Sequence, residues 1–231
     1  MPHAFPRYCH MGDRALLVEL GDQIGLEVNR RVRGLFVTLK DLSPDGIVEI
    51  IPGYCSLLLI IDPLGTTLTR LRETLGSILE TLDHSRIPEP GSMEVPVVYG
   101  GEYGPDLKWV ADYHGITPEE VVRLHTAHTY QVYMIGFMPG FPYMGELPKE
   151  LITPRRETPR TSVPRGSVAL AQAQTGIYPS QSPGGWQIIG RTPLTLFDPE
   201  NRPPSLLEMG DRVRFFAITE EEMIRWQNRK P

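Results

Sequence analysis

The first hundred residues alternate between short apolar runs and longer stretches in which apolar residues recur every three or four positions. Such a stripe between Gln23 and Lys40 predicts one amphipathic helix, and another from Leu68 to Leu82 predicts a second. Apolar runs that fit strands lie at 14–20, 47–51, 56–62 and 93–99. The order β-α-β-β-α-β predicts a ferredoxin-like domain over residues 1–92, and Pro96 indicates that the last strand, 93–99, lies at an edge or crosses between the domains.

The second half of the chain has a different pattern, in which proline and glycine interrupt short apolar runs every few residues. Strands are expected at 130–137, 167–171, 186–189, 194–197 and 212–218. Many short strands with dense turn signals are typical of a closed barrel or a sandwich. The sequence therefore predicts an α+β protein with a second, mostly β domain over residues 93–231.

Two helical segments interrupt or follow these strands. A small helical insert is expected at 105–127, where Thr117-Pro118 and a glutamate three residues after the threonine mark a helix start. A terminal helix is expected to begin at Thr219 and to end near Gln227. The insert is too acidic to favour a DNA-binding helix pair.

Composition narrows the possible partners. The 231 residues carry a net charge of −5, and the one basic cluster is short: Arg155, Arg156, Arg160 and Arg165. Nucleic-acid binding is not expected, because phosphate contacts need clustered Lys and Arg. The first twenty residues lack the apolar core of a signal peptide, and no stretch approaches the ~18 apolar residues of a membrane span. We therefore expect a cytoplasmic protein with no membrane contact.

Patterns of common catalytic and metal centres are missing. The sequence has no GxxxxGK[ST] loop, GxSxG elbow or HExxH motif. Cys9 and Cys55 are too few for a disulfide framework or a CxxC metal site. His125 and His128 share a helix face, but two ligands do not predict a zinc site. No metal site is expected, and the catalytic residues stay unknown.

Two segments rich in glycine, proline and aromatic residues stand out instead. Segment 136–145 (GFMPGFPYMG) combines flexible glycines, rigid prolines and flat rings. Segment 174–186 (QTGIYPSQSPGGW) offers side-chain and backbone donors, and Arg191 follows it. Backbone amides beside an arginine suit an anion such as carboxylate or phosphate. Both segments and Arg191 are expected to form one site; the alternatives are a packed turn and a hydrogen-bonded barrel rim.

The residues of this predicted site share special backbone freedom, flat rings or hydrogen-bonding groups. Within the set Arg191 is favoured as the anion partner, because a guanidinium binds an anion in bidentate fashion and lysine cannot. The residues expected to bind substrate are Phe137, Pro139, Phe141, Tyr143, Gln174, Thr175, Tyr178, Ser182, Gly184, Gly185, Trp186 and Arg191.

Three longer stretches carry a family resemblance: GFMPGFPYMGELP, TPRRETPRTSVPRGSVALA and QTGIYPSQSPGGWQIIGRTPLTLFDP. They resemble the shared motifs of the family that holds the B subunit of 5-oxoprolinase, the Kip kinase inhibitor and allophanate hydrolase subunit 1. The resemblance runs over residues 130–199. His125, on the helix before these motifs, also fits and joins the predicted substrate-binding set. One departure is Gln172, where the family often has Gly; its side chain is expected to re-line the site.

The resemblance implies an N-terminal α/β domain followed by a cyclophilin-like β-barrel. It also implies two partners: a second carboxyltransferase-like subunit of the C type, and a ring-opening subunit of the A type. Together such proteins open 5-oxoproline to L-glutamate at the expense of ATP. ATP is thus the cofactor expected in the assembled complex, and the chain is expected to be inactive without its partners.

Two other functions fit the same resemblance. The chain is alternatively an inhibitor that binds a sensor histidine kinase directly, or a component of the allophanate hydrolase type. Neighbouring genes would discriminate between these functions. Prolyl isomerase activity rests on analogy of fold alone and carries little weight.

Overall fold

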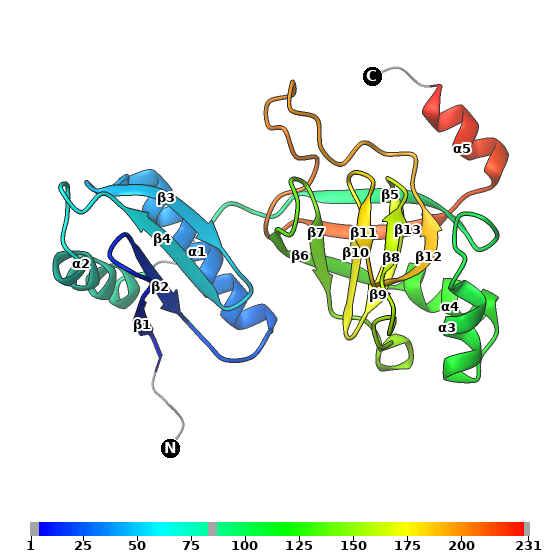
Figure 1. Ribbon diagram of the computed structural model, residues 1–231, viewed down its shortest axis with the longest axis horizontal. Coiled ribbons are helices and arrows are strands. Elements are labelled where there is room, and N and C mark those ends of the chain that lie inside the picture. Colours follow the sequence, from blue (N-terminus) through cyan, green and yellow to red (C-terminus); the bar gives the residue numbers. More distant parts are fainter. Residues whose placement is uncertain (1–4, 83–86, 229–231) are drawn as a thin grey trace. The chain divides into compact units, whose positions relative to one another are not determined.

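The computed structural model describes residues 5–82 and 87–228 (Figure 1). The chain divides into two compact units, Met1–Glu89 and Pro90–Pro231. None of the described helices is long and apolar enough to cross a lipid bilayer.

The first unit is one antiparallel sheet with two helices. Its elements are β1 (Arg7–His10), β2 (Ala15–Glu19), α1 (Leu26–Leu42), β3 (Ile47–Pro52), β4 (Ser56–Ile61) and α2 (Leu68–Glu80), and the strands lie in the order β1-β2-β4-β3. Alternate residues of β4, Leu57, Leu59 and Ile61, are buried, which is the period of two expected for a strand with one covered face. Helix α1 packs on β3 and β4 and contacts α2.

The predicted ferredoxin-like order is wrong at both ends. A strand at Arg7–His10 was not predicted, because four residues of mixed polarity carry no period-two signal. This strand, β1, takes the edge position beside β2. The strand expected at 93–99 belongs to the second unit, where Val95, Val97 and Val98 are buried. The first unit is therefore β-β-α-β-β-α.

The second unit is built around a closed seven-stranded barrel. This agrees with the prediction of an α+β protein whose second domain is a barrel. The barrel strands are β5 (Ser92–Tyr99), β6 (Thr129–Ile135), β7 (Pro142–Gly145), β9 (Ser167–Ala171), β10 (Gln174–Ile177), β12 (Gln187–Arg191) and β13 (Arg212–Ala217), in the order β10-β7-β6-β13-β5-β12-β9. Strands β5 and β13 are parallel, and the other pairs are antiparallel.

Short elements surround the barrel. They are α3 (Leu107–His114), α4 (Pro118–Ala127), the 3-10 turn η2 (Lys149–Leu151), α5 (Glu220–Gln227) and a two-stranded sheet of β8 (Arg160–Val163) and β11 (Ser182–Gly184). Thr117 caps α4 and Pro118 is its first residue, as predicted. The strand expected at 194–197 is absent from the described structure, where Phe197 makes one isolated bridge to Ser205.

The barrel interior is packed with aliphatic and aromatic side chains. Val97, Leu170, Ile189 and Phe215 come from four different strands and belong to one buried cluster. Helices α3 and α4 contribute Val110 and Val121 to the same cluster. A second, smaller cluster contains Phe141, Tyr178 and Trp186, and it leads to the candidate site.

Candidate functional site

A cavity of about 380 Å³ opens on the barrel unit beside the second cluster. We call it the aromatic cavity. Its lining residues are Phe137, Phe141, Tyr143, Arg155, Arg156, Pro159, Tyr178, Pro183, Gly184, Gly185 and Trp186. The two motif segments singled out in the sequence therefore meet here. Seven of the predicted substrate-binding residues line this cavity: Phe137, Phe141, Tyr143, Tyr178, Gly184, Gly185 and Trp186.

Phe141 is the centre of the cavity wall. Its ring lies 4.8 Å from Tyr143, 5.1 Å from Tyr178 and 5.5 Å from Trp186, measured between ring centroids. The pairs with Tyr178 and Trp186 are edge-to-face, the arrangement that ring quadrupoles favour. Phe141 is only 1% exposed and contacts all three rings, so it is the packed centre of this wall.

Two glycines make room for these rings. A β carbon at position 176 would lie 2.9 Å from Cζ of Phe141 and 3.0 Å from Cζ3 of Trp186. A β carbon at position 184 would collide with the hydroxyl of Tyr178. The glycines of the second motif are thus required by the close approach of backbone and ring.

The loop between β6 and β7 places Phe137 at the mouth of the cavity. Phe137 has φ of 66° and is 64% exposed. A left-handed conformation is uncommon for a bulky residue, and such strain concentrates at functional positions. Gly140, with φ of 81°, completes the turn against Phe197. Pro139, also predicted to bind substrate, is exposed in this loop and does not line the cavity.

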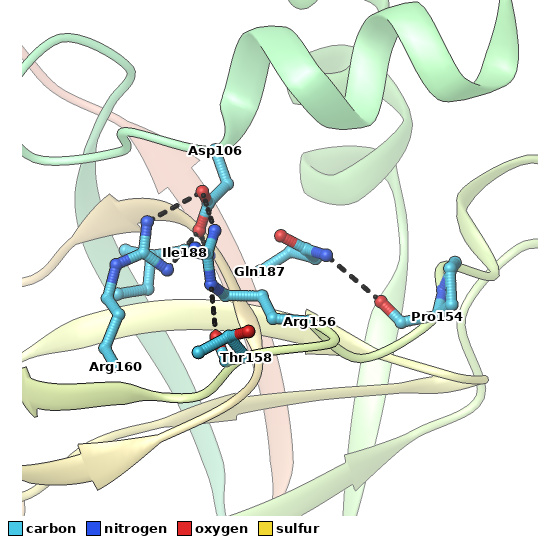
Figure 2. A network of polar contacts seen from close by, with 7 residues as sticks. All are labelled: Asp106, Pro154, Arg156, Thr158, Arg160, Gln187 and Ile188. Carbon is cyan, nitrogen blue, oxygen red and sulfur yellow. Dashed lines mark hydrogen bonds and ion pairs between the residues drawn. The ribbon is translucent and has the colours of Figure 1, made fainter.

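Arg155 and Arg156 supply positive charge to the cavity lining. Arg156 is held by Asp106, the residue before α3: its Nη1 lies 3.1 Å from Oδ1 of Asp106. Arg160 donates to both oxygens of the same carboxylate, at 2.8 and 2.7 Å. The backbone N–H of Ile188 donates to Oδ2 at 2.7 Å. Figure 2 shows how these groups converge on Asp106.

His125 lies in the barrel core and not in the cavity. It is fully buried; its Nδ1 is 2.8 Å from the hydroxyl of Tyr99, and its Nε2 is 3.0 Å from the hydroxyl of Thr175. The Thr175 hydroxyl donates to the carbonyl of Ala169, so it accepts from Nε2–H, and Nδ1 accepts from Tyr99. Burial lowers the pKa of His125 to about 3. The histidine and Thr175 therefore join α4 to the barrel as neutral groups.

The remaining predicted residues also lie outside the cavity lining. Arg191 ends β12, with its guanidinium carbon 5.2 Å from the centroid of the Tyr103 ring. Ser182 donates to the carbonyl of Pro183 at 3.1 Å, and Gln174 lies in β10. Arg191 therefore does not line the aromatic cavity, where Arg155 and Arg156 provide the positive charge.

Sequence reasoning missed Arg155, Arg156 and Asp106 as site residues. The arginines are visible in the sequence TPRRETPR, but there they bear only on the question of nucleic-acid binding, which is not expected. Asp106 carried no signal, because its partners are about fifty residues away in the chain. Within the described residues no group of three His, Cys, Asp or Glu side chains is placed to hold a metal ion.

A family model gives the class to which this barrel protein belongs. A model of the carboxyltransferase domain, subdomain C and D, matches residues 6–207. The chain therefore belongs to the family of carboxyltransferase domains of the subdomain C and D type.

Relatives within this family carry a more specific name. The chain is 40% identical over 226 residues to the 5-oxoprolinase B subunit of Bacillus subtilis (strain 168), covering 92% of each protein. It is 43% identical over 211 residues to the 5-oxoprolinase B subunit of Escherichia coli O157:H7, covering 90% of this chain and 94% of the relative. A third protein of that name, from Haemophilus influenzae, is 47% identical over 177 residues, which is 76% of this chain and 81% of the relative.

Solved structures share the fold. The crystal structure of TTHA0988 matches 89% of this chain with a TM-score of 0.79 and 37% identity, and this chain spans 40% of its length. The structure of PH0987 from Pyrococcus horikoshii matches 94% of this chain and 100% of its own, with a TM-score of 0.56 and 42% identity. The Kluyveromyces lactis urea amidolyase, at 23% identity and a TM-score of 0.74, has the same fold.

Proposed function

We propose that this chain is the B subunit of a 5-oxoprolinase. In this role it works with two other proteins, a second carboxyltransferase-like subunit of the C type and a ring-opening subunit of the A type, to convert 5-oxoproline to L-glutamate. The observation that supports this most directly is the identity of 40 to 47% to three proteins named as 5-oxoprolinase B subunits. The first of these alignments spans 92% of the chain and therefore reaches both structural units.

The chemistry needs an activated ring amide. The amide bond of 5-oxoproline is unreactive, and ATP supplies a phosphoryl group that turns the lactam oxygen into a leaving group. We propose that ATP is bound by the assembled complex, because this chain has no phosphate-binding glycine-rich loop. The barrel, which we propose to be of the cyclophilin-like type, contributes the aromatic cavity, whose flat walls fit a small ring.

Reconstitution tests the proposal. Purified chain is combined with the two partner proteins, 5-oxoproline and ATP, and L-glutamate release is measured, with each component omitted in turn. We expect ATP-dependent release with all three proteins and none with this chain alone. Absence of release from the complete mixture would overturn the proposal and leave the kinase-inhibitor alternative to be tested by direct binding. Turnover by this chain alone would contradict the dependence on partners.

A further inference from the structure

The contacts of Asp106 point to a role beyond holding the fold. We infer that Asp106 is a positioning residue that fixes Arg156 at the wall of the aromatic cavity, and that Arg156 there binds the carboxylate of a small, flat, ring-shaped ligand. This deepens the proposed function, on which it rests for the choice of 5-oxoproline as the ring.

The charge around Asp106 is unbalanced. Asp106 is 4% exposed, and its carboxylate accepts from the guanidinium groups of Arg156 and Arg160. One negative charge between two positive ones leaves one positive charge in excess in a half-buried place, where charge is costly unless it is compensated. The described lining of the cavity contains no carboxylate, and Arg155 adds a further positive charge. An anionic ligand would supply the missing negative charge.

Arg156 is fixed through both its backbone and its side chain. Its backbone N–H donates to the carbonyl of Gly185 at 2.8 Å, and its Nε donates to the carbonyl of Thr158 at 3.4 Å. Two residues earlier, the carbonyl of Pro154 accepts from Nε2 of Gln187 at 3.2 Å (Figure 2). With Nη1 held by Asp106, Nη2 has no hydrogen-bond partner among residues 5–82 and 87–228. A fixed guanidinium with one unused nitrogen at a cavity wall is arranged to bind an anion.

The rest of the wall selects the body of the ligand. Phe141, Tyr143 and Trp186 present ring faces and edges, which suit a flat apolar group. Burial raises the pKa of the Tyr143 and Tyr178 hydroxyls, and the nearby Arg155 charge opposes that rise. Positive charge and flat walls thus border the same space. A bare phosphate would satisfy the arginine but leave the aromatic walls uncovered, so a ring that carries a carboxylate fits better.

Binding to the isolated chain tests this directly by NMR. The indole N–H signal of Trp186 in the cavity is followed during titration with 5-oxoproline, with 2-pyrrolidinone, which lacks the carboxylate, and with inorganic phosphate. Trp109, on α3 and 44% exposed, serves as an internal control. We expect 5-oxoproline to shift the indole N–H signal of Trp186 and not that of Trp109. The shift should occur at about tenfold lower concentration of 5-oxoproline than of 2-pyrrolidinone. Equal affinity for the two rings, or tighter binding of phosphate, would overturn the inference.

Variants separate a positioning role from a structural one. A collapsed cavity would weaken the binding of 5-oxoproline and of 2-pyrrolidinone equally. Arg156→Gln and Asp106→Asn should each lower affinity for 5-oxoproline about tenfold and leave that for 2-pyrrolidinone unchanged. Arg156→Lys keeps the charge without the fork that Asp106 holds, and it should show the same selective loss even if Asp106→Asn fails to fold. Arg123→Gln removes an arginine whose partner is Glu120 on the surface, so it is the matched control and should bind like wild type.

The outcomes distinguish this inference from the proposed function. If the assembled complex releases glutamate but Trp186 does not respond to 5-oxoproline, the assignment of Arg156 and Asp106 is wrong and the proposed function stands. If Trp186 responds with the expected selectivity but the complete complex releases no glutamate, the proposed function is wrong and the carboxylate site stands. If Arg156→Gln and Arg156→Lys lose affinity equally for 5-oxoproline and 2-pyrrolidinone, Arg156 has a structural role and does not bind the carboxylate.

Discussion

At the scale of single residues, the structure explains why the related family often has Gly where this chain has Gln172. Gln172 was expected to re-line the site, since the related family often has Gly there. The structure corrects this: Gln172 is exposed in the turn between β9 and β10 and does not line the aromatic cavity. Its φ is 52°, in the left-handed region where glycine carries no steric penalty. Glycine at this position therefore serves the backbone of a turn.

We expect Gln172→Gly to stabilise the protein by roughly 0.5–1 kcal/mol, because relief of the left-handed strain exceeds the added freedom of the unfolded chain. Urea unfolding measures the difference. The matched control is Gln131→Gly inside β6, which should destabilise by roughly 0.5–1 kcal/mol. A loss of stability in Gln172→Gly would show that its left-handed conformation is not strained.

His125 makes stability depend on pH. Its pKa of about 3 in the folded protein lies below the ordinary value of 6.5, so the unfolded state binds the proton more readily between these values. Stability is therefore fully present above pH 6.5 and falls as the pH is lowered toward 3, by on the order of 1 kcal/mol per unit from this residue. Unfolding free energies from pH 7 to pH 5 should fall less steeply in His125→Gln than in wild type. Equal pH dependence of the unfolding free energy in both proteins would contradict the low pKa of His125 in the folded state.

At the scale of elements, the loops of the second unit are shaped by the rings they enclose. Gly176→Ala should destabilise by about 1–3 kcal/mol, because the added methyl overlaps the space of Phe141 and Trp186. Gly185→Ala in the same motif is the control: its β carbon would meet Pro159 at 3.5 Å, an ordinary contact. Thermal unfolding of both variants checks this. Comparable melting temperatures would show that the cavity wall adapts.

Elements with strong local signals were predictable, and those defined by distant partners were not. The start of α4 follows from Thr117 and Pro118, and α5 begins with the reciprocal bonds of Thr219 and Glu222, all within one turn. By contrast, the apolar run of β5 fits a strand of either unit equally well. Its membership is decided by pairing with β13 and β12, which no local pattern reveals.

The same distinction applies to the candidate site. Its rings and glycines were visible as motifs, because they sit together in the chain. The sequence favoured Arg191 for its positive charge, whereas Arg155 and Arg156 line the cavity. The Asp106 contacts that hold Arg156 join positions about fifty residues apart, and single residues carry no signal for such pairing. The aromatic part of a site is thus easier to predict here than its electrostatics.

At the scale of the whole molecule, we expect the two units to fold separately. A fragment of residues 90–231 keeps every barrel strand, whereas a fragment of residues 100–231 lacks β5. The first should give dispersed NMR signals and a cooperative thermal transition, and the second should not, because loss of β5 exposes edges of both β12 and β13. A folded 100–231 fragment would show that β5 is not needed to close the barrel.

The pairing of β5 with β13 also has a consequence for synthesis on the ribosome. The barrel seam joins Ser92–Tyr99 to Arg212–Ala217, so the barrel stays open until β13 has left the exit tunnel. The sheet of the first unit, by contrast, is complete once Ile61 has emerged. Domains folding during synthesis do so from the N-terminus, at about 5–20 residues per second. A nascent chain therefore carries a finished first unit ahead of an unclosed barrel for several seconds, during which the edge of β5 that pairs with β13 stays exposed.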